Sequence, residues 1–141
     1  MAAKILIVDD HEIVREGIRT LIERSGRGWQ ICGEAENSEQ AIEKAQSLKP
    51  DVIVLDITMP GVSGLTAAAR ISALKLPGRI LMFTMHESDR LATEVRLVGA
   101  HGVVLKSQAA RDLIRAIDCL LAGETFFGPE VKTEAKSKLQ A

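Results

Sequence analysis

The chain has 141 residues, of which 46% are hydrophobic and 26% charged, and its formal net charge is -1. This length and apolar content suit one globular domain with a buried core, whereas the balanced charge excludes the clearly basic surface typical of a nucleic-acid-binding domain. There is no transmembrane-length apolar run and no signal-peptide pattern, so we expect a cytoplasmic protein without a membrane partner.

Short apolar runs alternate with amphipathic stretches along the chain. The runs occupy residues 4–8, 29–35, 51–55, 79–83 and 102–105, and all but the second are nearly continuous, which indicates strands buried on both faces of a parallel sheet. Helical periodicity predicts helices over residues 12–25, 38–48, 64–75, 88–98 and 109–122. Ser38 is the expected N-cap of the second helix and Gly123 the expected stop of the last.

Five strand–helix units in succession predict an α/β fold. Right-handed crossovers between parallel strands place helices on both faces of the sheet, which gives a doubly wound architecture. We expect this domain to span residues 1–125, and residues 126–141, which lose the pattern, to form a short C-terminal cap and a linker. Ligands of such folds bind at the carboxyl ends of the strands, so these ends are where we expect chemistry.

Polar residues follow four of the predicted strands. The first strand ends in Asp9 and Asp10, the third in Asp56, the fourth in Thr84 and the fifth in Lys106. Because the carboxyl ends of parallel strands meet at one edge of the sheet, we expect these side chains to converge. Three close carboxylates cannot all be ionised unless a cation lies among them. Oxygen ligands favour Mg²⁺, and no cluster of His or Cys residues points to zinc or copper.

One of these carboxylates could also be a nucleophile, since aspartate side chains form covalent phosphoryl intermediates. Phosphoryl transfer needs an in-line attacker, a metal ion and a further positive charge, which Asp56, Mg²⁺ and Lys106 would supply. The hydroxyl of Thr84 could then donate a hydrogen bond to the new phosphoryl group. A dianionic group that arrives beside a hydroxyl on a short loop is typical of a switch.

The ordered set of these polar residues resembles the receiver domain of two-component response regulators. The local sequences ILIVDDH, DVIVLDITMPGVSGL and GAHGVVLKS agree, and the resemblance covers residues 4–123. It implies a five-stranded flavodoxin-like sheet of order 2-1-3-4-5. It also implies that Asp56 is the phospho-acceptor and that Asp9 and Asp10 hold Mg²⁺, directly or through water. Asp56 and the backbone carbonyl of Thr58 would complete the protein ligands of the metal.

The resemblance also implies the remaining roles and the partner. Lys106 would contact the phosphoryl group, Thr84 would be the switch hydroxyl, and the donor would be a phosphohistidine on a sensor histidine kinase. The domain would not be an enzyme beyond its own phosphorylation and autodephosphorylation at Asp56.

Longer segments resemble the subfamily that carries a LuxR-type helix-turn-helix domain, namely VDDHEIVREGIRTLIE, GEAENSEQAIEKAQSLKPDVIVLDITMPGVSG and the Lys-Ser pair at 106–107. We expect either a receiver separated from a longer transcription regulator or a stand-alone receiver, and the linker-like tail favours the first. DNA would then be contacted only through a domain that is not in this chain. A homodimer could form through the face around residues 88–122 or through the first and last helices.

Three positions affect how such a switch would work. Val103 stands where receivers commonly carry Tyr or Phe, and the chain contains no tyrosine, so an inward-swinging ring cannot report activation. Thr58 and His86, two residues beyond Asp56 and Thr84, should flank the path of the attacking water and tune the lifetime of the phosphoryl group.

Two alternatives stay open. A receiver-like module that binds partners without phosphorylation would tolerate the missing aromatic residue, although the intact acids and lysine favour phosphorylation. A phosphatase of the haloacid dehalogenase type also uses a strand-end aspartate, but it needs a second aspartate where this chain has Thr58.

Overall fold

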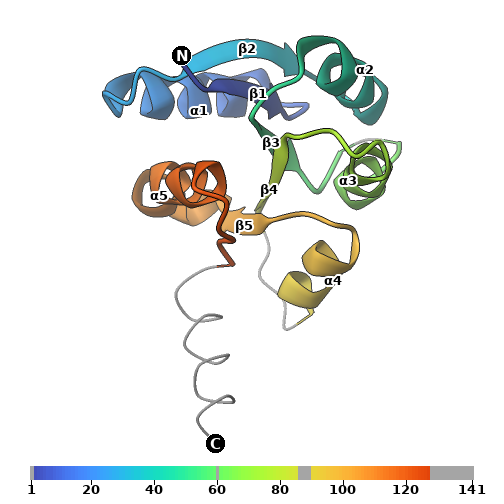
Figure 1. Cartoon of the computed structure of the whole chain (residues 1–141). Coiled ribbons are helices and arrows are strands. Elements are labelled where there is room, and N and C mark those ends of the chain that lie inside the picture. Colours follow the sequence, from blue (N-terminus) through green and yellow to red (C-terminus); the bar gives the residue numbers. More distant parts are fainter. Residues whose placement is uncertain (1, 60, 86–89, 128–141) are drawn as a thin grey trace, which may run out of the picture.

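The structure is a computed structural model that describes residues 2–59, 61–85 and 90–127 (Figure 1). Within them, five parallel strands form one sheet in the order β2-β1-β3-β4-β5. The strands are β1 (Lys4–Val8), β2 (Gln30–Ala35), β3 (Val52–Asp56), β4 (Arg79–Thr84) and β5 (Gly102–Leu105). The helices are α1 (Glu12–Arg24), α2 (Ser38–Leu48), α3 (Gly64–Ala73), α4 (Leu91–Leu97), α5 (Ala109–Leu121) and a 3-10 turn over Lys106–Gln108. The predicted fold and strand order are confirmed.

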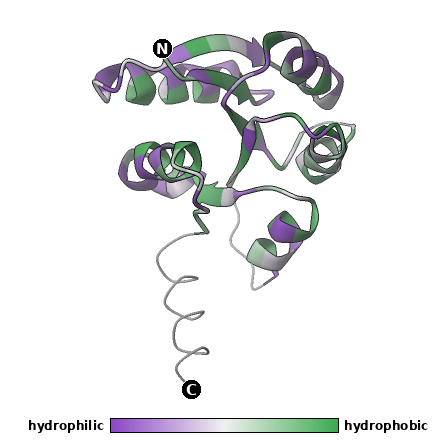
Figure 2. Cartoon of the chain, viewed as in Figure 1, coloured by the Kyte–Doolittle hydropathy of each residue, from purple (hydrophilic) through white to green (hydrophobic). Residues whose placement is uncertain are grey.

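Helices cover both faces of the sheet. Figure 1 shows α1 and α5 on one face and α2, α3 and α4 on the other. Successive residues of a strand point to opposite faces, so Leu6 and Met82 join the core under α2–α4, while Ile5 and Leu81 join the core under α1 and α5. Figure 2 shows the resulting concentration of hydrophobic residues along the strands. None of the helices in the described residues is long and apolar enough to cross a membrane.

The predicted range of the second helix is confirmed, but its predicted N-cap is wrong by one residue. The N-cap of α2 is Asn37, whose side chain accepts a hydrogen bond from the backbone N–H of Gln40 at 2.9 Å. Ser38 is already helical and buried, and its hydroxyl donates to the backbone carbonyl of Val62. Asn and Ser are both good N-caps, and only the contact with the distant Val62 carbonyl decides between them.

The other predicted ends match the observed ones or differ from them by one or two residues, apart from the start of the fourth helix. Residues 88 and 89, the predicted start of the fourth helix, lie outside the described residues. Gly123 ends α5 as predicted, because it adopts a φ of 85° and donates its N–H to the carbonyl of Leu120.

The segment after α5 packs back onto the sheet. Phe126 and Phe127 are both buried. Phe126 lies beside β5, where it donates its N–H to the carbonyl of His101 and accepts a hydrogen bond from the N–H of Val103. These two residues therefore pack into the core of the domain, and the predicted division at residue 125 stays a prediction. Residues 128–141 of the predicted cap and linker lie outside the described residues.

Gly64 lets the start of α3 approach the end of β3. Its N–H donates to the carbonyl of Ile57 at 2.8 Å, and a Cβ at this position would lie 1.9 Å from the backbone oxygen of Asp56. Only glycine leaves room for this approach, so Gly64 contributes to holding the strand end that carries Asp56.

We expect Gly64→Ala to lower the free energy of unfolding by about 3 kcal/mol, at the upper end of the cost of overpacking, because the methyl group meets backbone and not a flexible side chain. Urea unfolding followed by circular dichroism measures this. Gly17→Ala, inside α1 with open space around its Cβ, is the matched control and should stabilise the protein by about 0.5–1 kcal/mol. Equal effects of both substitutions would contradict the packing argument.

Candidate functional site

The polar residues that follow the strands meet at one edge of the sheet, as expected. Asp9 follows β1, Asp56 ends β3 and Thr84 ends β4, and all three are buried. Lys106 follows β5 and has a side chain that is 14% exposed. The register pairs Asp56 with Phe83 and Thr84 with Leu105, which brings these strand ends to the same level.

Lys106 joins two of the acids. Its Nζ lies 2.9 Å from Oδ2 of Asp9 and 3.2 Å from Oδ1 of Asp56. Burial alone would lower the pKa of the Lys106 ammonium, but the two carboxylates outweigh it, and the pKa is raised above its ordinary value. Lys106 is therefore held in its charged form.

The two carboxylate oxygens of Asp56 differ in their contacts. Oδ1 faces Lys106 and accepts a hydrogen bond from the backbone N–H of Thr58 at 3.1 Å, whereas Oδ2 has no hydrogen-bond partner among the described residues. Burial, followed by the charge of Asp9, raises the pKa of Asp56 against the opposing effects of Lys106 and Thr58. A further positive charge would therefore stabilise the ionised carboxylate.

Asp10 and His11 complete the cluster on the more exposed side. The Nδ1 atom of His11 lies 3.1 Å from Oδ1 of Asp9 and 3.2 Å from Oδ1 of Asp10. The backbone N–H of His11 also donates to Oδ1 of Asp9 at 2.8 Å. From the sequence, His11 was expected in the first helical turn and not among the ligands, although its position directly after the acid pair was a signal for these contacts.

These groups fit a hard divalent cation. Donor atoms of Asp9, Asp10, His11 and Asp56 all lie within 4.8 Å of one another. The ammonium of Lys106 contacts the carboxylates of Asp9 and Asp56. The buried Oδ1 of Asp10 accepts no hydrogen bond within the described residues and is an oxygen ligand of the kind that Mg²⁺ prefers. The direct role of the Thr58 carbonyl stays a prediction, since the contact seen for Thr58 is made by its N–H.

The remaining predicted site residues are Val103, His86 and Thr58. Val103 lies within β5 opposite Met82, is buried, and is three residues ahead of Lys106. His86 lies outside the described residues. Thr58 is exposed on the loop after β3, beside Asp56. The roles predicted for all three stay predictions.

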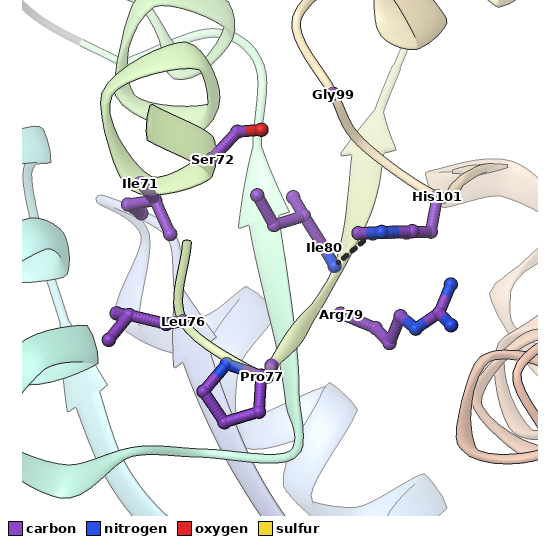
Figure 3. Close-up of a pocket in the computed structure, with 9 residues that line it drawn as sticks. Ile71, Ser72, Leu76, Pro77, Arg79, Ile80, Gly99 and His101 are labelled. Atoms are coloured by element: carbon purple, nitrogen blue, oxygen red, sulfur yellow. Dashed lines mark hydrogen bonds between the residues drawn. The ribbon is translucent and has the colours of Figure 1, made fainter. Parts of the chain in front are cut away.

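A pocket of about 340 Å³ lies at the opposite ends of the strands (Figure 3). It is bounded by the end of α3, the start of β4 and the turn before β5, and shares no residue with the acid cluster. His101 lines it and accepts a hydrogen bond on Nδ1 from the backbone N–H of Ile80 at 3.0 Å. Burial, and then the charge of Arg79, lower the pKa of His101.

This contact predicts a pH dependence of stability. The folded state needs a neutral His101, whereas the unfolded chain takes up a proton near the ordinary histidine pKa of about 6.5. The contribution of His101 is thus present above that pH and is lost as the pH falls below it, by at most about 1.4 kcal/mol per pH unit. His101→Asn keeps an acceptor but does not titrate. We expect the free energy of unfolding of wild type, relative to that of the variant, to decrease as the pH is lowered from about 8 to about 5, as measured by urea unfolding. A difference between the two proteins that does not change with pH would contradict this expectation.

The chain matches a known protein family over most of its length. Residues 5–118 match the family model of the response regulator receiver domain. The chain is 38% identical to the nitrate/nitrite response regulator protein NarL of Escherichia coli K12 over 141 residues, covering 99% of this chain and 64% of NarL. The chain thus spans less than two thirds of the length of this relative.

Solved structures of response regulators support the same family assignment. A two-component response regulator of the LuxR family from Aurantimonas sp. SI85-9A1 superposes with a TM-score of 0.88 at 37% identity, over 100% of both chains. The isolated receiver domain of RcsB from Salmonella enterica serovar Typhimurium, solved with the phosphomimetic BeF3-, gives 0.83 at 29% identity, over 94% of this chain and 98% of that one. The chain therefore belongs to the receiver domains of two-component response regulators.

Proposed function

We propose that this receiver domain is switched by phosphorylation of Asp56. The donor is a phosphohistidine on a sensor histidine kinase, and the reaction depends on Mg²⁺. The observation that carries the proposal is the asymmetry of the Asp56 carboxylate. Its Oδ1 is held by Lys106 and Thr58, while its buried Oδ2 has no hydrogen-bond partner among the described residues and keeps its lone pairs for a reaction.

The side chains of the cluster suggest how the transfer proceeds. Oδ2 of Asp56 attacks the phosphorus, a P–O bond forms, the P–N bond to the donor imidazole breaks, and the leaving imidazole takes up a proton. Asp9, Asp10, Asp56 and the carbonyl of Thr58 would hold Mg²⁺, which when bound supplies neutralising charge to the phosphoryl oxygens. Lys106, 3.2 Å from Oδ1 of Asp56, supplies the second positive charge.

The signal would leave the site through β4 and β5. In this proposal the hydroxyl of Thr84 binds the new phosphoryl group and displaces the end of β4, and Thr58 and His86 tune the lifetime of the phosphoryl group. Val103 occupies the switch position without a ring, but its N–H is bonded to the carbonyl of Phe126. A shift of β5 would therefore reach the segment after residue 125, which we infer to lead toward a DNA-binding output domain.

The assembly that follows phosphorylation belongs to the proposal as well. Phosphorylation would shift a pre-existing equilibrium between two conformations that present different surfaces to a partner. A homodimer could form through the face around residues 88–122 or through α1 and α5. Neither surface is favoured by a contact in the described residues.

The alternative is a receiver-like module that binds a partner without phosphorylation, and the absence of tyrosine from the chain is the feature that favours it. A phosphatase of the haloacid dehalogenase type has no such support, because the family match is to receivers. Phosphorylation of the isolated chain separates the first two functions.

The experiment is intact mass measurement after incubation with acetyl phosphate, with Mg²⁺ or with EDTA. We expect one phosphoryl adduct that forms only with the metal. Rapid quenching into acid guards against a short-lived phosphate. No adduct at any quench time would contradict the proposal and favour the interaction module.

A further inference from the structure

Arg15 is a charged residue on the buried side of α1. It is 9% exposed and lies three and seven positions before Ile18 and Ile22, which are the buried apolar residues of this helix. A guanidinium in such a place is costly unless its donors find well-placed acceptors. The acceptors of Arg15 therefore indicate what its burial achieves.

Arg15 connects the acid pair to β2. Its Nη1 donates to the backbone carbonyl of Asp9 at 2.6 Å, and its Nε donates to Oε1 of Glu34 at 2.9 Å. The backbone of Glu34 is held by α2, because Lys44 donates to its carbonyl. The other carboxylate oxygen of Glu34 pairs with Arg19, one turn further along α1. Arg15 is thus a brace between Glu34 on β2 and the end of β1.

The brace acts on the peptide that joins the two adjacent acids. The N–H of Asp9 donates to the carbonyl of Ala35 on β2 at 3.1 Å, so the strand ladder already holds the preceding peptide. The carbonyl of Asp9 belongs to the next planar unit, which continues into Asp10. The hydrogen bond from Arg15 fixes the rotation of this plane and with it the direction in which the Asp10 side chain leaves the backbone relative to that of Asp9.

We propose that Arg15 is a positioning residue of the magnesium site, which fixes the mutual orientation of Asp9 and Asp10 through the carbonyl of Asp9. This inference rests on the proposed function. Mg²⁺ demands nearly ideal octahedral geometry, and groups that orient the ligands of a metal typically change its affinity by about 10- to 100-fold. Lys could not replace Arg15, because an ammonium lacks the fork that reaches both acceptors.

Charge and geometry predict effects of opposite sign. The guanidinium of Arg15, bonded to the carbonyl of Asp9, repels Mg²⁺ bound beside that residue, so its removal should strengthen Mg²⁺ binding if only charge matters. If Arg15 orients the ligands, its removal weakens binding. Arg19 is the matched control, because it also places a positive charge on α1 beside Glu34, yet no contact between Arg19 and Asp9 is present in the described residues.

The test is a Mg²⁺ titration of the metal-free protein followed by amide chemical shifts in NMR, for wild type, Arg15→Met, Arg15→Lys and Arg19→Met. Thermal unfolding of each variant is measured first, and Arg15→Lys keeps the charge in case Arg15→Met does not fold. We expect the Mg²⁺ dissociation constant to rise about tenfold in both Arg15 variants and to change less than about twofold in Arg19→Met.

Each outcome decides the inference. The inference is overturned if Arg15→Met or Arg15→Lys binds Mg²⁺ as tightly as wild type or more tightly. It is also overturned if Arg19→Met loses as much affinity as the Arg15 variants, since that loss would come through Glu34 and not through the carbonyl of Asp9. In both cases a wild type that binds Mg²⁺ leaves the proposed function standing. A wild type that does not bind Mg²⁺ overturns both.

Discussion

Asp56→Asn is expected to abolish the phosphoryl adduct and, in the absence of Mg²⁺, to make the protein more stable. The amide lacks the nucleophilic oxygen pair of the carboxylate, so transfer at this position is lost altogether. Burial and the charge of Asp9 penalise the ionised carboxylate of the wild type, and a neutral side chain of the same size escapes that penalty. Intact mass and urea unfolding in EDTA measure the two effects.

Asp118→Asn provides the control for both measurements. This aspartate lies on α5 away from the cluster and pairs with Arg27 on the surface. The variant should keep the adduct, and its stability should change by no more than about 1 kcal/mol. An adduct that survives Asp56→Asn would mean that another group is the acceptor, and a less stable Asp56→Asn protein would contradict the electrostatic account of the cluster.

Lys106→Met is expected to have the second largest effect. Its ammonium is the cation that bridges Asp9 and Asp56, and without it two buried carboxylates lose their compensation. The free energy of unfolding in EDTA should fall by about 2 kcal/mol, less than for a fully buried pair because Asp56, whose pKa is raised, can take up a proton. Added Mg²⁺ should restore most of the loss, since it supplies the missing positive charge.

Lys75→Met is the matched control for this substitution, because Lys75 is exposed in the turn after α3. Its stability should be close to that of wild type with and without Mg²⁺. If Lys106→Met were as stable as wild type in EDTA, the ammonium would not be compensating the two acids, and the assignment of its charge to phosphoryl transfer would lose its structural basis.

The fold, and the edge of the sheet at which the candidate site lies, follow from local patterns in the sequence. Continuous apolar runs identify buried parallel strands, and the rule that ligands bind at the carboxyl ends of strands turns five scattered polar residues into one cluster. The observed contacts of Lys106 with Asp9 and Asp56 agree with that expectation. Strand ends are predictable because the sheet alone fixes where they lie.

The contacts that orient the site are less accessible to sequence reasoning. Arg15 lies on the same face of α1 as Ile18 and Ile22, and a charged residue on an apolar face indicates a special contact. Its acceptors, however, lie at the end of β1 and on β2, far from it in the sequence. The buried position of Phe126 and the preference for Asn37 over Ser38 as N-cap also depend on partners far away in the chain. Periodicity reports which face of an element is buried and not what it contacts.

The most direct test of the central claim is the position of the phosphoryl group. The protein is incubated with acetyl phosphate and Mg²⁺, the acyl phosphate is reduced with borohydride, which converts a phosphorylated aspartate to homoserine, and the peptides are sequenced by mass spectrometry. The account predicts homoserine in place of Asp56 and nowhere else. Homoserine in place of Asp9 or Asp10, or an adduct that resists borohydride, would contradict it.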